Sequence, residues 1–315
     1  MKKLTRFTDF TVKQIQQLCA IPSPSGFTAE VREYLRKQFT EMSLPVTESN
    51  KGSVIIDLGG KGNPLVLAAH VDTLGAMVRS IKGNGRLRMT QVGGYPFNYI
   101  ETENCLVHTR TGKVFDGTIM LVNPASHVNR KAGSTERTDE TMEVVLDEKV
   151  FDKNDVKKLG INAGDFISFN PRTVVTKSGY IKSRHLDDKA SAAVLIALAK
   201  YILKEKALLT RKVYLLFTTY EEVGHGGSSG IPEDALEMIS VDMGAVGDDL
   251  ETDEHKVSIC AKDSSGPYDY DITNSLIKIA KEKKLQYAVD IYPFYGSDVS
   301  GTLRAGYDIR HGLIG

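Results

Sequence analysis

The chain lacks the features that mark several large classes of protein. Its 315 residues carry 40 Lys and Arg against 40 Asp and Glu, so the formal net charge is zero. A surface that binds nucleic acid or an anionic membrane needs a basic excess or a lysine-rich run, and the sequence has neither. Its apolar runs also fall short of the roughly 20 residues that a membrane-spanning helix requires. We therefore expect no nucleic-acid partner and no membrane association.

Cysteine is scarce as well. The three cysteines, Cys19, Cys105 and Cys260, are isolated, odd in number and without zinc-finger spacing, which favours reduced, inert thiols. The charged start Met1–Arg6 is not followed by an apolar stretch long enough for a signal peptide. A cytoplasmic location is the expectation. No Gly-x-Ser-x-Gly motif occurs and no cysteine has a catalytic setting, so serine and cysteine nucleophiles are disfavoured.

The chain does contain strand-like and helix-like runs that alternate. Leu65–Ala69 is nearly continuous apolar, as in a strand covered on both faces, and Lys212–Thr218 and Met238–Val241 are similar. Ala190–Lys204 and Ile272–Lys283 have helical composition and spacing. This alternation predicts an α/β fold with a mixed, mostly parallel sheet and helices on both faces.

The N-terminal part is expected to be helical. Apolar residues at helical spacing predict a first helix that begins behind a Thr8 cap and contains Val12, Ile15 and Leu18. A second amphipathic helix is expected around 31–39, after the breaker run Pro22–Gly26.

Between Leu74 and Thr173 the pattern changes. Short β-like segments alternate with Gly, Asn and charged turns at 76–81, 86–90, 105–109, 113–121, 141–146 and 165–169. Short strands at close spacing predict a small inserted β-barrel or β-sandwich. We therefore expect a discontinuous catalytic domain, residues 1–73 and 174–315, around a β-rich insert at 74–173.

A histidine and an aspartate follow the first buried strand. His70 and Asp72 come at its carboxyl end, where open α/β sheets form ligand sites. A histidine there can bind a metal through one ring nitrogen, and a nearby carboxylate can fix its tautomer or contact metal-bound water. The alternative is an ordinary solvated loop pair.

Two further aspartate motifs have the same character. Asp187-Asp188 opens the helix that contains Ala190, where carboxylates also serve as ordinary helix caps. Lys189 can neutralise Asp188, which leaves Asp187 free to bridge two cations. Asp242 follows a strand as His70 does, although it is also compatible with a simple strand-ending turn.

Glu221 and Glu222 follow the strand at 212–218. Two adjacent glutamates at the end of a buried strand are costly to desolvate without partners. A metal can be the partner of one, which leaves the other free to take a proton from metal-bound water. The glycine-rich run Gly226–Gly230 permits a close backbone approach. A surface turn with two solvated acids is the alternative.

These four clusters in this order predict a two-metal peptidase. Ala69–Asp72, Leu186–Asp188, Glu221–Gly224 and Val241–Gly244 resemble the motifs of the M42 family of metalloaminopeptidases, which includes glutamyl and deblocking aminopeptidases. Gly296–Asp298 resembles the Gly-Ser/Thr-Asp element of that family. The resemblance runs from the N-terminal helix to the end of the chain.

The resemblance also implies roles for individual residues. The implied metal ligands are His70, Asp187, Glu222 and Asp242. Asp187 would bridge two divalent ions, Zn or Co with Mn possible, while His70 and Asp242 hold one ion and Glu222 holds the other. Glu221 would be the general base, and Asp72 would orient His70.

The implied activity is removal of the N-terminal residue from short peptides by a water that two metal ions activate. The insert would be an oligomerisation domain, because family members assemble as dimers to dodecamers. The sequence leaves the preferred first residue and the physiological metal open.

One family feature falls outside this sequence. The second metal of the family takes a further histidine near the C-terminus, at a position past Gly315. We expect the chain to be truncated or followed by a disordered tail that carries this ligand; His311, which comes too early, is the other option. Two alternative functions stay open: a related metallohydrolase (N-acyl amino acid deacylase or carboxypeptidase), and a catalytically weakened peptide-binding homologue that lacks this histidine.

Overall fold

The computed structural model describes residues 2–315, with side chains from Arg6 onward. The chain forms two compact units. The first comprises the segment up to Ile21, Thr28–Asp72 and Thr173–Gly315, and the second comprises Pro22–Phe27 and Thr73–Arg172. The predicted combination of a mixed, helix-covered sheet with a small β-domain is confirmed.

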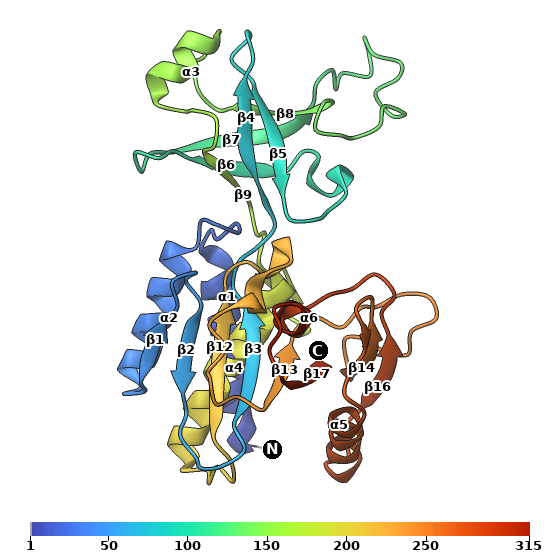
Figure 1. Cartoon of the computed structure of the whole chain (residues 1–315). Coiled ribbons are helices and arrows are strands. Elements are labelled where there is room, and N and C mark those ends of the chain that lie inside the picture. Colours follow the sequence, from blue (N-terminus) through green and yellow to red (C-terminus); the bar gives the residue numbers. More distant parts are fainter. Residues whose placement is uncertain (1) are drawn as a thin grey trace. The chain divides into compact units, whose positions relative to one another are not determined.

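The first unit is built on a nine-stranded mixed sheet (Figure 1). Its centre consists of four mutually parallel strands, in the order β12 (Val213–Thr218), β3 (Leu65–His70), β13 (Glu237–Val241) and β17 (Arg310–Ile314). Antiparallel strands extend it beside β12 with β2 (Val54–Asp57) and β1 (Val46–Glu48). Beyond β17 lie β14 (Val257–Asp263), β15 (Gly266–Pro267) and β16 (Tyr287–Ile291). The small hairpin of β10 (Val174–Val175) and β11 (Ile181–Lys182) is separate from this sheet.

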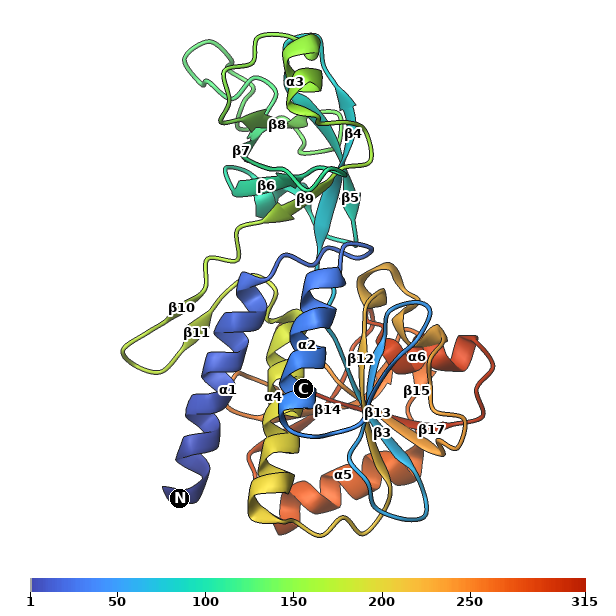
Figure 2. The same ribbon diagram turned by 90° about the vertical axis from the view of Figure 1, so that its left-hand side faces the viewer.

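Helices cover both faces of the sheet. One face carries α1 (Lys2–Ala20), α2 (Ala29–Glu41) and α4 (Leu186–Glu205), as Figure 2 shows. The other face carries α6 (Asp298–Arg304) through Val299, while α5 (Tyr270–Glu282) packs against β14 and β17. None of the described helices is long and apolar enough to cross a membrane.

The strands β3 and β12 are almost continuously apolar because both of their faces are buried. In β12, Leu215 and Phe217 point to the face with α1, α2 and α4, whereas Tyr214 and Leu216 point to the opposite face. Successive side chains of a strand alternate between faces, so a strand covered on both sides loses its polar positions. The continuous apolar run therefore predicted the strand's place in the sheet.

The predicted start of the first helix is wrong. Thr8 lies inside α1, which begins at Lys2. The apolar stripe of the helix extends upstream of Thr8, because Phe7 is buried and its ring packs edge-on against Tyr201 of α4 at a centroid distance of 5.3 Å. That contact favours the helical conformation one turn before the expected cap.

The second unit is a closed antiparallel barrel, which decides between the two predicted β architectures (Figure 1). Around the barrel the order is β4 (Gly75–Ile81), β5 (Leu87–Val92), β8 (Met142–Leu146), β7 (Val114–Leu121), β6 (Asn104–His108) and β9 (Phe166–Phe169). The ring closes because β9 pairs with both β4 and β6. Two short helices, η1 (Phe97–Ile100) and α3 (Lys153–Leu159), complete the unit.

Candidate metal centre

The polar clusters predicted from the sequence meet at the carboxyl edge of the central sheet. His70 is the last residue of β3, and Asp242 directly follows β13. Beyond the end of β12, Glu221 and Glu222 open the one-turn 3-10 helix η2 (Glu221–Val223). Because these strands are parallel, their carboxyl ends lie at the same edge.

Asp187 and Asp188 join this edge from the first turn of α4. Both have non-helical backbone angles, so a kink separates them from the regular part of the helix. Asp188 forms a side-chain hydrogen bond with Ser191 in that helix. Its Oδ2 also accepts a hydrogen bond of 3.1 Å from the backbone N–H of His70. Asp188 therefore contacts both its own helix and the sheet edge.

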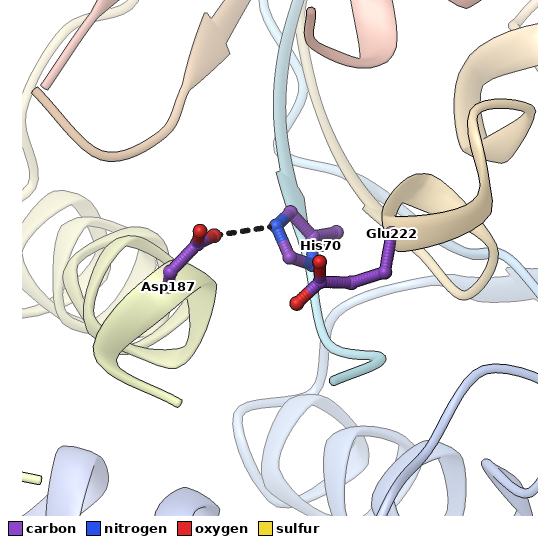
Figure 3. A group of neighbouring side chains, drawn as sticks. All are labelled: His70, Asp187 and Glu222. Atoms are coloured by element: carbon purple, nitrogen blue, oxygen red, sulfur yellow. Dashed lines mark hydrogen bonds and ion pairs between the residues drawn. The ribbon is translucent and has the colours of Figure 1, made fainter. Parts of the chain in front are cut away.

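Two groups of potential metal-donor atoms result, and both contain His70. In one group His70 lies with Asp187 and Glu222, as Figure 3 shows, and in the other with Asp188 and Asp242. Within each group the donor atoms lie within 4.8 Å of one another. The structure thus brings together all four residues that the family resemblance implied as ligands. It adds Asp188, which the sequence had led us to pair with Lys189.

Lys189 has other partners, so the expectation that it neutralises Asp188 is wrong. The Lys189 side chain is fully buried, and its Nζ donates to the carbonyl oxygens of Leu18 at 2.8 Å and Ile21 at 2.5 Å. The Leu18 carbonyl also accepts from the Ile21 N–H at 3.1 Å, so the lysine ammonium is a second, charged donor at the end of α1. Asp188 is left to the metal groups.

His70 is oriented for a metal through its outer ring nitrogen. The side chain is 1% exposed, with Nδ1 3.0 Å from the carbonyl oxygen of Asp72 and Nε2 2.9 Å from Asp187 Oδ1. A proton on Nδ1 that is donated to the Asp72 carbonyl leaves the Nε2 lone pair free. Burial alone would lower the pKa of His70, but hydrogen bonds to Asp187 and Asp72 and the charge of Glu221 hold this pKa well above its ordinary value.

Asp72 also holds the glutamate pair. It is fully buried; its Oδ1 accepts from the Glu221 backbone N–H at 3.2 Å and its Oδ2 from the Glu222 N–H at 3.3 Å. A carboxylate with two hydrogen bonds to successive N–H groups fixes both residues of the turn. Sequence reasoning had connected Asp72 with His70 alone, because a contact across 149 residues of chain leaves no local pattern.

The carboxylates of this edge crowd one another in a buried environment. Burial and the charge of Asp187 raise the pKa of Asp242 to about 7. Burial is also the main cause that raises the pKa of Asp188 and of Glu221 well above their ordinary values. Each of these acids favours a proton, or a cation in its place.

A divalent cation fits this donor set. Among the described residues, Asp188 Oδ1 is buried without a hydrogen-bond partner, a costly state for a carboxylate oxygen. One imidazole nitrogen and several carboxylate oxygens are ligands that Zn²⁺, Co²⁺ and Mn²⁺ accept. Metal binding would also supply the positive charge that the clustered acids need.

The other histidines near the motifs have different surroundings. His225 stacks on Tyr220 with a centroid distance of 5.0 Å, and its Nδ1 lies 3.1 Å from Lys51 Nζ. His311 sits at the start of β17, with its ring 5.1 Å from that of Tyr268. Neither belongs to the metal groups found among the described residues.

Comparisons with known proteins identify the family of the chain. A family model described as M42 glutamyl aminopeptidase matches residues 52–315. The chain is 46% identical over 307 residues to a putative aminopeptidase, YhfE, of Bacillus subtilis (strain 168), covering 97% of this chain and 89% of that protein. It is 25% identical over 219 residues to a glutamyl aminopeptidase of Lactococcus lactis subsp. cremoris (strain MG1363), covering 68% of this chain and 61% of that protein.

Solved structures share the fold at lower identity. A TET aminopeptidase from a marine sediment Thaumarchaeota archaeon superimposes with a TM-score of 0.86 at 20% identity, covering 98% of this chain and 88% of that chain. The TET1 peptidase of Pyrococcus horikoshii gives a TM-score of 0.83 at 21% identity, covering 96% and 90%. That peptidase is described as assembling into a tetrahedron or a large octahedral shell.

Proposed function

The chain belongs to the M42 peptidase family, whose members are aminopeptidases, and we propose that it is a metal-dependent aminopeptidase acting on short peptides. The observation that carries the proposal is the convergence of His70 and Asp242 with Asp187 and Glu222 at one sheet edge. Three acids and a histidine from four separate segments have no evident structural reason to meet there. A metal site at this edge of the sheet would explain why they meet.

The proposal assigns a role to each ligand. His70 and Asp242 would hold one divalent ion, Glu222 would hold a second, and Asp187 would bridge them. Asp188 adds a further carboxylate to the group that contains Asp242. When bound, such ions would polarise the carbonyl of the first peptide bond and make a water nucleophilic near neutral pH.

Glu221 is the general base in this proposal. Its side chain is 15% exposed, and Oε2 lies 3.6 Å from His70 Nε2, beside the donor groups but outside them. The raised pKa of Glu221 suits a group that takes a proton from the attacking water. The same proton then passes to the nitrogen of the leaving amine, so that Glu221 ends the cycle as it began.

A substrate panel tests the proposal. Unblocked and N-acetylated aminoacyl anilides are offered to the protein with Co²⁺ or Zn²⁺, and again after chelation. Metal-dependent cleavage of the unblocked compounds is the expected result, and the best compound identifies the preferred first residue. Cleavage of the acetylated compounds alone would point to the deacylase alternative. Absence of cleavage in both sets, with metal bound, would leave a peptide-binding homologue.

The β-barrel unit is proposed to be an oligomerisation domain, with boundaries at residues 74–173. Its support is the shell-forming Pyrococcus horikoshii TET1 peptidase, which this chain resembles along its length. Light scattering on the purified protein should give a mass of at least two chains. A monomer at micromolar concentration would contradict this assignment.

A further inference from the structure

The first turn of α6 packs closely against the loop that follows Glu221 and Glu222. That loop contains the short 3-10 helix η3 (Gly226–Ser228), and two of its residues leave no room for a side chain. A Cβ on Gly226 would lie 2.3 Å from Asp298 Oδ1, and a Cβ on Gly227 would lie 2.2 Å from the Asp298 carbonyl oxygen. Thr302 Oγ1 adds a hydrogen bond of 2.8 Å to the Gly227 carbonyl. The close approach of α6 therefore requires both glycines, and Thr218 and the Glu221 backbone also crowd Gly226.

Asp298 is the residue at the centre of this contact. It is 2% exposed, and its Oδ2 accepts a hydrogen bond of 2.7 Å from Thr218 Oγ1 at the end of β12. Its Oδ1 faces Gly226, and the carboxylate also has a backbone hydrogen bond from Gly227.

The position of Asp298 is fixed because several hydrogen bonds hold the first turn of α6. Ser297 and Ser300 form a reciprocal capping box at the N-terminus of the helix. Ser300 Oγ donates to Asp263 Oδ2 at 2.7 Å, and the Tyr268 hydroxyl donates to the same oxygen at 3.0 Å. The first turn of α6 is thus a fixed support for the loop that contains η3.

The loop is in turn in contact with the glutamates. The position of the absent Gly226 Cβ is 2.9 Å from the Glu221 backbone nitrogen, whose N–H group donates to Asp72. The same position is 2.3 Å from Asp298 Oδ1, so Gly226 fills a narrow space between the Asp298 carboxylate and the Glu221 backbone. The Glu221 backbone is held by Asp72 and adjoins Gly226, which in turn adjoins Asp298.

We propose that Asp298 is a positioning residue for the Glu221–Glu222 segment, its buried carboxylate setting the place of the loop behind the two glutamates. This inference rests on the proposed function for its catalytic consequence, but not for its structural one. The Gly-Ser-Asp element thus acts on the reaction through Gly226 and Glu221, without contact with substrate.

The test compares Asp298→Asn with a matched control, Asp290→Asn. Asp290 is 6% exposed and accepts from the backbone N–H groups of Glu251 at 2.9 Å and Thr252 at 3.0 Å. These contacts do not involve Glu221 or Glu222. Both variants remove a buried charge, so both should lose stability. Asp298→Asn places amide hydrogens against Gly226 or Thr218, which should displace the loop. Thr302→Val, which removes the bond to Gly227, is a milder second variant.

Two readouts are needed. The first is hydrogen exchange of the peptide covering residues 219–229 in the metal-free protein, which should accelerate in Asp298→Asn and Thr302→Val but not in Asp290→Asn. The second is turnover of the best unblocked substrate with Co²⁺ bound. Since small misplacements of catalytic groups are costly, Asp298→Asn should lower kcat about 10- to 100-fold with KM nearly unchanged.

The outcomes separate the two proposals. Faster exchange with lower kcat supports the positioning role. Faster exchange in the variants of a protein whose wild type cleaves no substrate supports the positioning role and refutes the aminopeptidase. Unchanged exchange and unchanged kcat in both Asp298→Asn and Thr302→Val overturn the inference, as does an equal loss of kcat in Asp290→Asn.

Discussion

The two edges of the central sheet treat their carboxylates in opposite ways, and a single strand shows both. At the amino end of β13, Glu237 forms ion pairs with Arg211 and with Arg310, the residue opposite it on β17. Just past the carboxyl end of the same strand, Asp242 is 4% exposed and lies among Asp187, Asp188 and His70. At one edge two arginines balance Glu237, whereas at the other edge carboxylates lie against one another.

That difference separates structural charge from functional charge. A carboxylate between two guanidiniums is satisfied at any pH near neutral and needs nothing more from the solution. Clustered acids with raised pKa values store unfavourable energy, which is relieved only by protons or by a bound cation. The crowded acids at this edge therefore support the proposed metal site. Substitutions at the two edges should have separable effects.

The largest expected effect is that of Glu221→Gln on turnover. The amide cannot take a proton from the attacking water, so kcat should fall by about 100- to 10,000-fold. Metal content, measured by elemental analysis after gel filtration, should stay at the wild-type level because Glu221 lies outside both donor groups. Unchanged turnover would refute the general-base assignment. Turnover lost together with metal would make Glu221 a ligand.

Asp242→Asn should act on metal affinity. The neutral amide keeps the size of the side chain and its acceptor oxygen for the Met243 N–H, but it removes a charged ligand. We expect a loss of at least about tenfold in Zn²⁺ affinity, measured by competition with a chromophoric chelator. The matched variant at the other edge, Glu237→Gln, should bind Zn²⁺ as the wild type does. Equal affinity in both variants would remove Asp242 from the ligand set.

Stability of the metal-free protein should depend on pH in an unusual direction. The pKa of Asp242 is about 7 in the folded chain and about 3.8 in the unfolded chain, so the folded state holds the extra proton between these values. The free energy of unfolding that this group contributes therefore falls as the pH rises from 4 toward 7. Saturating Zn²⁺ should reverse this trend, since the ion binds the deprotonated ligands.

Asp242→Asn isolates this contribution. With chelator present, the variant and the wild type should have similar unfolding free energies at acidic pH. At pH values above the folded pKa the variant should be more stable by at least about 1 kcal/mol. Denaturant titrations at the two pH values measure the difference. A wild type that gains stability relative to the variant as the pH rises would contradict the charge crowding that the structure shows.

The motifs at strand ends were predictable because they depend only on local sequence. An apolar run predicts a buried strand, and the residues directly after that run must lie at the sheet edge, so His70, Asp242 and the two glutamates could be expected to converge. The partners of Lys189 could not be predicted in this way. They are the carbonyls of Leu18 in the first helix and of Ile21 just after it, about 170 residues away in the sequence. The expected pairing of Asp188 with Lys189 was wrong for the same reason, because the contacts of Lys189 are with residues distant in the sequence.

The contact of Asp298 with Gly226 shows the same limit. The sequence indicated that the glycine run permits a close approach, but the approaching element is α6, a seven-residue helix with weak helical signal. Gly226 and Asp298 are far apart in the sequence and meet only because the sheet brings their segments together. Position in the chain identified the donors of the site, whereas the tertiary fold decided which side chains support them.

The smallest effect is expected at the balanced edge itself. In Glu237→Gln, one neutral oxygen remains between Arg211 and Arg310, whose side chains are 30% and 55% exposed and so remain partly hydrated. Because water compensates such guanidiniums, the loss should be only about 0.5–1 kcal/mol, visible as a small drop in the melting temperature. Turnover per folded molecule and Zn²⁺ affinity should stay at the wild-type level, since Glu237 lies at the start of the strand that ends before Asp242. A fall in either would mean that the two edges are coupled through β13, and that the charge balance at one end of the strand helps to place the ligand at the other.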